Sequence, residues 1–352
     1  MKKVILILLM LLLLVLAAAG SFIWTKIKSI EELRLNTSSA TEFEVLKGKN
    51  LYQIIDNLAS YGKIDRFSFK VWLQFNREFE KIQSGFYELP ANARLVDVLS
   101  LLSNGEVKQF SVTLIEGQTI VQWIKTLSQA QGVSHNISSK EELYITLGGG
   151  DYEFCANIHF SIEGCLLPDT YFYTHGTSSI NILKRALIAM HAYLQDVWPT
   201  RFADLPINSQ YEALILASII EKETAVESER SEIAGVFVNR LNENMRLQTD
   251  PTVIYGIGDS YDGNITRKHL RTPTPYNTYV IKGLPITPIA MPNKASIQAT
   301  LFPAVTDSLY FVATGNGGHQ FSTNLKDHNK AVREYLAQRK RNIVDKNEKG
   351  TQ

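Results

Sequence analysis

The sequence predicts an α+β ectodomain carried on one N-terminal membrane helix, with a small α+β domain followed by a larger, mixed α/β domain. Three observations lead to this prediction. A long apolar run opens the chain, and short alternating segments and amphipathic helical patterns follow it as far as about residue 108. Loops rich in glycine, proline and aromatic residues then separate longer helices after about residue 145. A length of 352 residues is sufficient for two domains.

The N-terminal segment indicates a membrane anchor. Two lysines precede an apolar run from Val4 to Trp24, which is about the length that crosses a bilayer as a helix. The lysines favour a cytoplasmic N-terminus. The alternative is a signal peptide that is cleaved after Ala17–Ala19. In both cases the residues after about 25 are expected outside the cytoplasm.

A polar spacer is expected at residues 25–40, and a small α+β domain at residues 41–108. Two short strands and three amphipathic helices are predicted in this domain. In chain order they cover residues 43–46, 51–58, 67–79, 85–89 and 95–102. Gly105 is expected to end the last of these helices.

A strand–turn–helix pattern occurs twice in the chain. Val45–Leu51 (VLKGKNL) is matched by Leu114–Ile120 (LIEGQTI), and each copy indicates a strand, a glycine turn, a polar helix cap and an apolar helix start. Extended to Ala59, the first copy (VLKGKNLYQIIDNLA) resembles the opening of a LysM domain, a small peptidoglycan-binding module. A glycine turn before an amphipathic helix is also common in ordinary folded cores, so glycan binding and a purely structural role both stay open here.

The rest of the chain is expected to form one domain at residues 109–341, with a flexible tail at residues 342–352. Helices are predicted at residues 180–197, 209–224, 228–241 and 327–341, with a buried strand at residues 309–313. Five of the eleven prolines fall between Pro273 and Pro292. A long non-helical surface loop inside a compact domain usually serves a binding site, so ligand contacts are expected there.

Composition and residue spacing argue against several classes of ligand. The formal net charge is +1 with no block of basic residues, whereas a surface that binds nucleic acid needs a basic patch. The seven histidines are scattered without the spacing of metal ligands, so neither a metal site nor a cofactor is predicted. The two cysteines are Cys155 and Cys165, and both a disulfide and two free thiols agree with their spacing.

The helix at residues 211–224 carries the candidate catalytic residue. Between Ala213 and Ile220 the helix is apolar on every side except at Ser218, so this stretch is expected to be buried. Glu221 follows on the same face as Ser218. A carboxyl group at such a buried edge loses hydration, which favours the protonated form that an acid catalyst needs. Glu223 can be argued in the same way, and an exposed glutamate at the last turn of a core helix is the plain alternative.

Two further segments offer groups that suit sugar recognition. The stretch Arg246–Gly256 (RLQTDPTVIYG) places polar residues before a proline-started helical turn, which is also an ordinary helix start with Asp250 as its cap. Sugar recognition uses such hydrogen-bonding groups together with a flat ring. The candidates are Gln248, Asp250 and Tyr255 in this stretch, with Tyr276, Asn277 and Thr278 in the proline-rich loop.

Five motifs occur in one order along the chain. They are Ile162–Tyr171 (IEGCLLPDTY), Leu214–Gly256 (LILASIIEKETAVESERSEIAGVFVNRLNENMRLQTDPTVIYG), Pro275–Tyr279 (PYNTY), Gly283–Ile289 (GLPITPI) and Gly317–Ser322 (GGHQFS). With these motifs the chain resembles the YceG-like family of endolytic murein transglycosylases. The similarity runs from about residue 43 to residue 337, and the LysM-like opening and the N-terminal anchor fit the same family.

The resemblance implies that Glu221, the first glutamate of the EKET segment, is the catalytic residue, and it makes Glu223 the lesser choice. The residues expected to contact the substrate are Ser218, Gln248, Asp250, Tyr255, Tyr276, Asn277 and Thr278. Two departures from the family pattern stand out. Ala290–Asn293 (AMPN) stands where the family more often has Asn-Pro-Gly, which puts a polar or backbone role of that turn in doubt. Cys165 occupies a position that is often aromatic or aliphatic, which argues mildly against a required disulfide.

The activity that the resemblance implies is cleavage of the β-1,4 bond between N-acetylmuramic acid and N-acetylglucosamine without water. It leaves 1,6-anhydro ends and limits the length of nascent glycan strands. One carboxyl group can serve both proton transfers because the nucleophile, the C6 hydroxyl, belongs to the same sugar. Asp250, Glu163 and Asp169 stay as candidate partners of Glu221.

Two alternatives stay open beside this activity. One is a lysozyme-like hydrolase that uses two carboxylates, and the other is a wall-binding scaffold without catalysis. The expected partners are peptidoglycan glycan strands, the membrane through one helix and, at the level of the family, peptidoglycan synthases. The expected location is the cytoplasmic (inner) membrane, with a single pass and the catalytic domain on the outer side.

Overall fold

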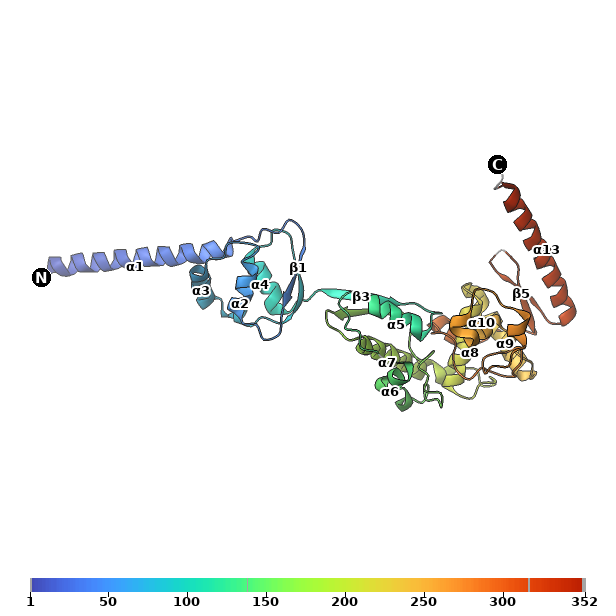
Figure 1. Cartoon of the computed structure of the whole chain (residues 1–352). Helices are drawn as coiled ribbons and strands as arrows, with labels where there is room; N and C mark the ends of the chain where they lie inside the picture. Colours follow the sequence, from blue (N-terminus) through green and yellow to red (C-terminus); the bar gives the residue numbers. More distant parts are fainter. Residues whose placement is uncertain (1, 138, 316, 350–352) are drawn as a thin grey trace. The chain divides into compact units, whose positions relative to one another are not determined.

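The computed structural model describes residues 2–137, 139–315 and 317–349, with side chains as far as residue 339. Within these residues the protein is a mixed α+β structure with three two-stranded sheets and one long N-terminal helix. The chain divides into two compact units (Figure 1). Unit 1 comprises Met1–Phe110 and Phe172–Gly176, and unit 2 comprises Ser111–Tyr171 and Thr177–Gln352.

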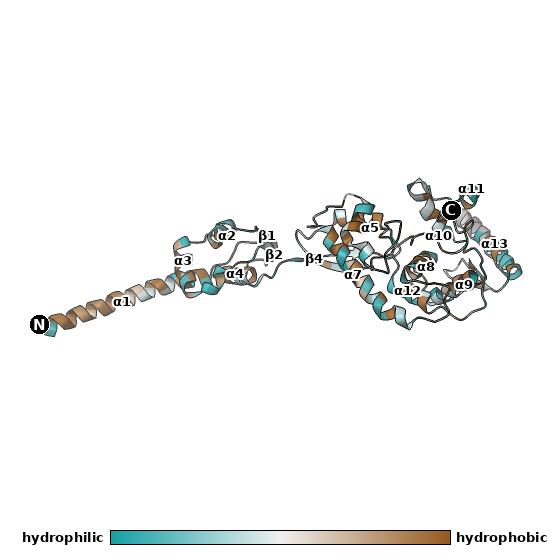
Figure 2. Ribbon diagram, turned by 90° about the horizontal axis from the view of Figure 1, so that it is seen from below, coloured by the Kyte–Doolittle hydropathy of each residue, from teal (hydrophilic) through white to brown (hydrophobic). Residues whose placement is uncertain are grey.

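Helix α1 (Lys2–Glu31) is apolar over most of its length, as Figure 2 shows. Among the described residues it is the one helix that is both long and apolar enough to cross a membrane. The side chains from Val4 to Leu16 are all exposed. Exposed apolar surface of this extent needs a lipid or protein environment, so the helix agrees with the predicted anchor.

Unit 1 places helices around one small sheet. Strands β1 (Thr41–Val45) and β2 (Gly85–Leu89) are antiparallel, with Phe43 opposite Tyr87. The helices are α2 (Leu51–Leu58), α3 (Arg66–Phe75), the 3-10 turn Arg77–Glu80 and α4 (Leu95–Asn104). The sheet and the helices share one core in which Phe69, Trp72 and Tyr87 are among the largest buried side chains. The helix predicted at residues 67–79 is therefore two elements, because α3 ends at Phe75.

The segment expected to be a polar spacer, residues 25–40, belongs to unit 1. Helix α1 continues to Glu31, and it packs against α3 and α4. Ile30 and Leu35 are each 1% exposed, and the Leu35 N–H donates to the Ala93 carbonyl at 2.9 Å. The segment predicted as a polar spacer is thus part of the folded unit, because a few apolar residues among the polar ones reach its core.

The repeated strand–turn–helix pattern has the same local structure in both copies. Gly48 and Gly117 have positive φ angles of 87° and 68° in the two turns, a conformation that favours glycine. The next helix in each copy starts with a capping box, formed by Asn50 with Gln53 at α2 and by Thr119 with Gln122 at α5. Local side-chain chemistry therefore explains why both helices begin where the sequence predicts.

The rest of the chain contains most of the helices. The elements after unit 1's helices are β3 (Gln109–Leu114), α5 (Ile120–Gln129), α6 (Lys140–Leu147), β4 (Asp169–Thr174), α7 (Ser179–Val197), α8 (Gln210–Glu223), α9 (Arg230–Asn242), α10 (Asp250–Ile257), α11 (Arg267–Arg271), α12 (Lys294–Leu301), β5 (Tyr310–Ala313), β6 (His319–Ser322) and α13 (Leu325–Lys349). Strand β3 pairs with β4, and β5 pairs antiparallel with β6. Helices α6, α11 and α12 were not predicted from the sequence.

Helix α8 is the central helix of unit 2. Every residue from Ala213 to Ile220 is buried, as the sequence predicts. Helices α9, α10 and α12 pack against it, and Figure 2 shows these helices grouped together. A helix that is apolar on all sides has to be covered on all sides. The helices packed around α8 therefore fix the positions of its two ends.

The C-terminal elements differ from the prediction in two details. The strand expected to be buried at residues 309–313 begins at Tyr310 and is only half-buried. Helix α13 continues to Lys349, past the predicted helix end at Arg341 and into the predicted tail. Residues 350–352 of that tail lie outside the described residues.

The two cysteines form a disulfide. Cys155 and Cys165 are fully buried and bonded to each other, which closes a loop with a sequence separation of 10 residues. The sequence left this pairing open, and the bond holds the two ends of the segment that carries Glu163.

Replacing both cysteines, as Cys155→Ala with Cys165→Ala, should lower the free energy of unfolding by about 2–3 kcal/mol, because the bond restricts the unfolded chain. Guanidinium unfolding followed by circular dichroism measures the loss. A reducing agent should destabilise the wild-type protein by a similar amount and leave the double variant unchanged. Equal stability of both proteins without reductant would contradict a structural role of the bond.

Candidate functional site

The last turn of α8 places two glutamates on different sides of the helix. Glu221 and Glu223 are both half-buried, and α8 ends at Glu223. Two residues along a helix turn the side chain by about 200°, so the two carboxyl groups face different neighbours. Helical periodicity alone could not choose between them, whereas their surroundings differ clearly.

The carboxylate of Glu221 lies at the N-terminus of α12. Its Oε2 accepts a hydrogen bond from the Asn293 N–H at 3.0 Å and another from the Ser296 hydroxyl at 2.7 Å. Asn293 is also the N-cap of α12 and accepts from the Ser296 N–H at 2.8 Å. A helix N-terminus favours negative charge. Among the described residues none donates to Oε1, so one carboxylate oxygen is anchored and the other is available.

The glycine turn before α5 also lies next to Glu221. The Gly117 N–H donates to the Met291 carbonyl and the Met291 N–H donates to the Gln118 carbonyl, both at 2.9 Å. A Cβ atom on Gly117 would lie 3.7 Å from Cγ of Glu221. The Lys222 ammonium donates to the Gly117 carbonyl at 3.1 Å. The end of α8, the turn before α5 and the segment before α12 therefore meet around one carboxylate.

The segment Ala290–Asn293 has a backbone role, although its departure from the family pattern put such a role in doubt. Met291 pairs with the glycine turn through its backbone, and Asn293 donates its backbone N–H to Glu221. A main-chain donor does not depend on the side chain unless the residue is proline. The turn has a backbone role even though its sequence is AMPN.

Glu223 faces the other side, toward α10. It accepts a hydrogen bond from the Thr249 hydroxyl. Burial raises the pKa of Glu223, the Thr249 hydrogen bond opposes this, and the charge of Asp250 adds to it. Glu223 lines a cavity of about 490 Å³. The polar and aromatic residues that share this lining include Arg240, Gln248, Thr249, Asp250, Tyr279, Tyr310 and His328.

Gln248 and Asp250 are the sequence candidates that the structure brings to this cavity. Both are exposed and both line it. Gln248 has a φ of 53°, a left-handed conformation that is uncommon for a residue other than glycine and often occurs at functional sites. Asp250 accepts a hydrogen bond from the Tyr279 hydroxyl at 2.7 Å. Thr249, not Asp250, is the N-cap of α10.

Three sequence candidates are buried and support the site from within. Ser218 donates to the Ile215 carbonyl at 2.7 Å and accepts from the Ile289 N–H at 3.0 Å, so its hydroxyl is occupied. Asn277 and Thr278 are 1% and 0% exposed, and both hydrogen bond to neighbouring backbone. Each of these three side chains is enclosed by protein, and their contact with the substrate stays a prediction.

Tyr255 and Tyr276 are half-buried and lie in a separate cluster with Glu163. Their ring centroids are 5.0 Å apart in an edge-to-face arrangement. The Tyr255 hydroxyl donates to Oε2 of Glu163 at 3.1 Å, and the Tyr276 hydroxyl shares a hydrogen bond of 2.9 Å with Thr287. Both hydroxyl groups are thus engaged with protein, and the structure does not bring either ring to the cavity lined by Glu223.

Glu163 is the carboxyl group of this cluster. The sequence offered it only as a candidate partner of Glu221. It is 1% exposed. Besides the Tyr255 hydroxyl it accepts from the Ile120 N–H at 2.9 Å. Burial raises the pKa of Glu163 to about 7, and the two hydrogen bonds oppose this. Asp169, the other candidate partner, is exposed at the start of β4.

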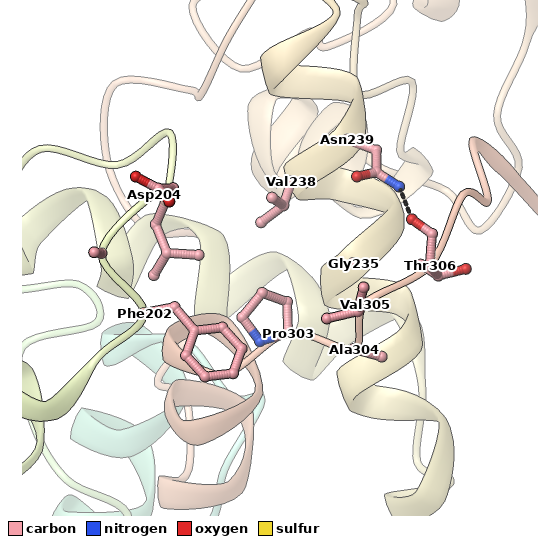
Figure 3. Close-up of a pocket in the computed structure, with 11 residues that line it drawn as sticks. Phe202, Asp204, Gly235, Val238, Asn239, Pro303, Ala304, Val305 and Thr306 are labelled. Carbon is pink, nitrogen blue, oxygen red and sulfur yellow. Dashed lines mark hydrogen bonds between the residues drawn. The ribbon is translucent and has the colours of Figure 1, made fainter.

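A second hollow lies away from these carboxylates. It has a volume of about 430 Å³ and is lined by residues 202–205, part of α9 and residues 303–306. Figure 3 shows Asn239 donating to the Thr306 carbonyl at its edge, at 2.7 Å. Asp204 is the one ionisable side chain in its described lining. Without a constellation of reactive groups, this hollow is a weaker candidate than the surroundings of Glu221.

The GGHQFS motif forms a pair with the start of α9. The Glu229 carboxylate accepts from the His319 N–H at 2.9 Å and lies 2.8 Å from His319 Nδ1. A Cβ atom on Gly318 would lie 2.8 Å from Glu229 Oε1, so a larger residue there would displace the Glu229 carboxylate. Burial alone raises the pKa of Glu229, but the hydrogen bonds from His319 outweigh it and lower that pKa below its usual value of 4.5.

Glu229→Gln should reduce the free energy of unfolding by about 1–2 kcal/mol at pH 7, because a charge-assisted pair becomes neutral. The lowered pKa of Glu229 means that its contribution is present above pH 4.5 and is lost as the pH falls through the lower, folded-state value. Urea unfolding of both proteins from pH 7 to pH 3 measures this. A stability difference that grows toward acid pH would contradict the assignment.

Comparison with known proteins agrees with the sequence motifs. A model of the YceG-like family matches residues 43–334. The chain is 30% identical over 333 residues to the endolytic murein transglycosylase of Bacillus subtilis (strain 168), covering 90% of this chain and 91% of that protein. It is 26% identical over 339 residues to the endolytic murein transglycosylase of Streptococcus pneumoniae serotype 2, covering 88% of this chain and 61% of that protein.

A solved structure is also similar. The crystal structure of a yceG-like protein from Listeria monocytogenes matches with a TM-score of 0.54 and 27% sequence identity. The match covers 84% of this chain and 99% of that one.

Proposed function

Because the chain belongs to the YceG-like family, we propose that it is an endolytic murein transglycosylase with Glu221 as its catalytic acid and base. One observation carries the choice of residue. The Glu221 carboxylate has one oxygen held by the N-terminus of α12 and the other without a protein donor among the described residues. Such a group is fixed in orientation and can still reach a substrate.

The proposed reaction uses no water. Protonated Glu221 gives its proton to the oxygen that links N-acetylmuramic acid to N-acetylglucosamine, and the bond from the muramyl C1 to that oxygen breaks through an oxocarbenium-like state. The Glu221 carboxylate then takes the proton of the muramyl C6 hydroxyl while O6 bonds to C1. The products are a 1,6-anhydro end and a free 4-hydroxyl. Between the two steps, Asn293 and Ser296 stabilise the carboxylate.

The cavity lined by Gln248, Asp250 and Tyr279 is proposed to bind a part of the glycan away from the bond that is cut, because its lining includes Glu223 and not Glu221. Its amide, carboxylate and hydroxyl groups can orient a sugar, and its ring faces can pack against it. In this proposal Ser218, Asn277 and Thr278 hold the surrounding backbone in place. Tyr255 and Tyr276 support the site through their hydrogen bonds to Glu163 and Thr287.

The proposed location is the cytoplasmic (inner) membrane, with the N-terminus in the cytoplasm and both units outside. The apolar helix α1, the two lysines at its start and the disulfide support this orientation, because disulfides persist in oxidising compartments. Residues 41–108 are proposed as a LysM-like module that binds glycan, and residues 109–341 as the catalytic domain. Cuts close to the membrane would limit the length of nascent strands, in cooperation with peptidoglycan synthases.

Glu221→Gln should lower the rate of strand cleavage by about 100-fold or more, because it removes the group that transfers both protons. The assay uses full-length protein in detergent on uncrosslinked glycan strands, with products identified by mass spectrometry. Wild-type products should carry anhydro ends, which are lighter than reducing ends by one water. Glu227→Gln, at an exposed glutamate in the 3-10 turn Glu227–Glu229 before α9, is the matched control.

Three results would count against the proposal. Reducing ends would identify a lysozyme-like hydrolase. Full activity of Glu221→Gln would remove that residue from the chemistry. Binding of strands without any cleavage by the wild-type protein would identify a scaffold.

Gln248→Asn should raise KM by about fivefold to tenfold and leave kcat nearly unchanged, because a lost substrate hydrogen bond costs about 1 kcal/mol. Asparagine tolerates the left-handed backbone at this position, so the unfolding midpoint should stay the same. Steady-state kinetics on soluble strands measures both constants. An unchanged KM would place the glycan elsewhere.

A further inference from the structure

Glu163 has no direct contact with Glu221, yet it is buried without a cationic partner. Among the described residues no lysine, arginine or histidine forms an ion pair with it. It accepts one hydrogen bond at each oxygen, from the Ile120 N–H at 2.9 Å and from the Tyr255 hydroxyl at 3.1 Å. Removing a carboxylate from water is unfavourable unless its environment repays the loss. A neutral side chain could fill the same space, so the charge calls for an explanation.

Glu163 holds the start of helix α5. Ile120 is the first residue of α5, and its N–H is one of the unpaired donors at that helix start. The carboxylate of Glu163 therefore caps α5 from outside, in addition to the local capping box of Thr119. Tyr255 belongs to α10, so one carboxyl group connects two helices.

A series of contacts connects the start of α5 to the catalytic carboxyl group. The start of α5 continues directly from the turn at Gly117 and Gln118, which pairs twice with the Met291 backbone at 2.9 Å. Gly164, next to Glu163, also donates its N–H to the Met291 sulfur at 3.2 Å. Two residues further on, Asn293 donates to Glu221 at 3.0 Å. The links in this path are hydrogen bonds and two short stretches of backbone, all within unit 2.

We propose that Glu163 is a positioning residue for Glu221. Its buried carboxylate holds the start of α5, and through the Gly117 turn and Met291 it keeps the N-terminus of α12 against the catalytic carboxyl group. The proposal rests on the proposed function, because it gives Glu163 a purpose only if Glu221 is catalytic. It assigns Glu163 no contact with the glycan.

The charge state of Glu163 gives the proposal a distinctive signature. The titratable groups that act on it are Tyr255 on α10, Tyr276 in the proline-rich loop, Tyr211 on α8 and Lys140 at the start of α6. Burial raises the pKa of Glu163 to about 7. The ionised form holds both donors by charge-assisted hydrogen bonds, which are about twice as strong as neutral ones. The turn should therefore be held better above pH 7 than below it.

Stability should change in the opposite direction. A carboxyl group with a raised pKa binds its proton more tightly in the folded protein than in the unfolded one. Its stabilising contribution is therefore complete below about pH 4.5, the usual value, and is lost as the pH rises through about 7. An ordinary structural carboxylate would show neither this loss of stability nor a parallel gain in kcat.

The test is Glu163→Gln in the full-length protein, because glutamine has the size of the protonated acid and cannot ionise. We expect kcat to fall about tenfold at pH 8 with KM nearly unchanged. The ratio of the wild-type kcat to the variant kcat should rise between pH 6 and pH 8, because the two proteins share the titration of Glu221 and only the wild type can ionise residue 163. Hydrogen exchange should accelerate in residues 115–123 and 289–296 and stay the same elsewhere. The matched control is Glu153→Gln, at an exposed glutamate near the same disulfide.

Several outcomes would overturn the proposal. These are an unchanged kcat, a change in KM alone, exchange that accelerates throughout the protein, or exchange that stays the same at both segments. If Glu163→Gln does not fold, Tyr255→Phe removes one of the two donors. This variant should change kcat and hydrogen exchange in the same way but to a smaller extent, and the lack of these changes would overturn the proposal. If the wild-type protein cuts no glycan, the proposed function fails, and exchange at the two segments still decides whether Glu163 orders the site.

Discussion

The complete burial of α8 is the constraint on which the rest of unit 2 depends. Eight consecutive residues from Ala213 to Ile220 have no exposed face, so α9, α10 and α12 must cover the helix from several sides. The first polar residues after this stretch then emerge at fixed points. Glu221 meets the N-terminus of α12, and Glu223 meets α10. The position of each carboxyl group is thus a consequence of core packing, which is rigid at close range.

Local sequence signals predicted the local structure well. The apolar stretch of α8, the two glycine turns and the polar caps that precede α2 and α5 all depend on residues within a few positions of each other. The same reasoning failed where the deciding partner is remote in sequence. Glu221 is held by Asn293 and Ser296, more than seventy residues later, and no periodicity within α8 contains that information.

The differences from the sequence predictions have similar causes. Ser218 shares a helical face with Glu221 as expected, but one turn before Glu221 this face packs against the Ile289 backbone, which encloses the Ser218 hydroxyl. Helix α12 was missed because its eight residues have weak amphipathic patterning, although Asn293 after a proline is a recognisable cap. Only the ordered family motifs favoured Glu221 over Glu223, and the surroundings of the two carboxyl groups explain why α8 alone could not.

The unbroken path of α1 into unit 1 has a mechanical consequence. A module on a flexible tether explores a hemisphere above the bilayer, whereas a module joined by a continuous helix moves with the tilt and rotation of that helix. Beyond Trp24 the helix adds about 10 Å before it ends at Glu31. Once α1 is inserted, unit 1 would sweep a thin layer at nearly constant height, and its movement over the bilayer would be close to two-dimensional.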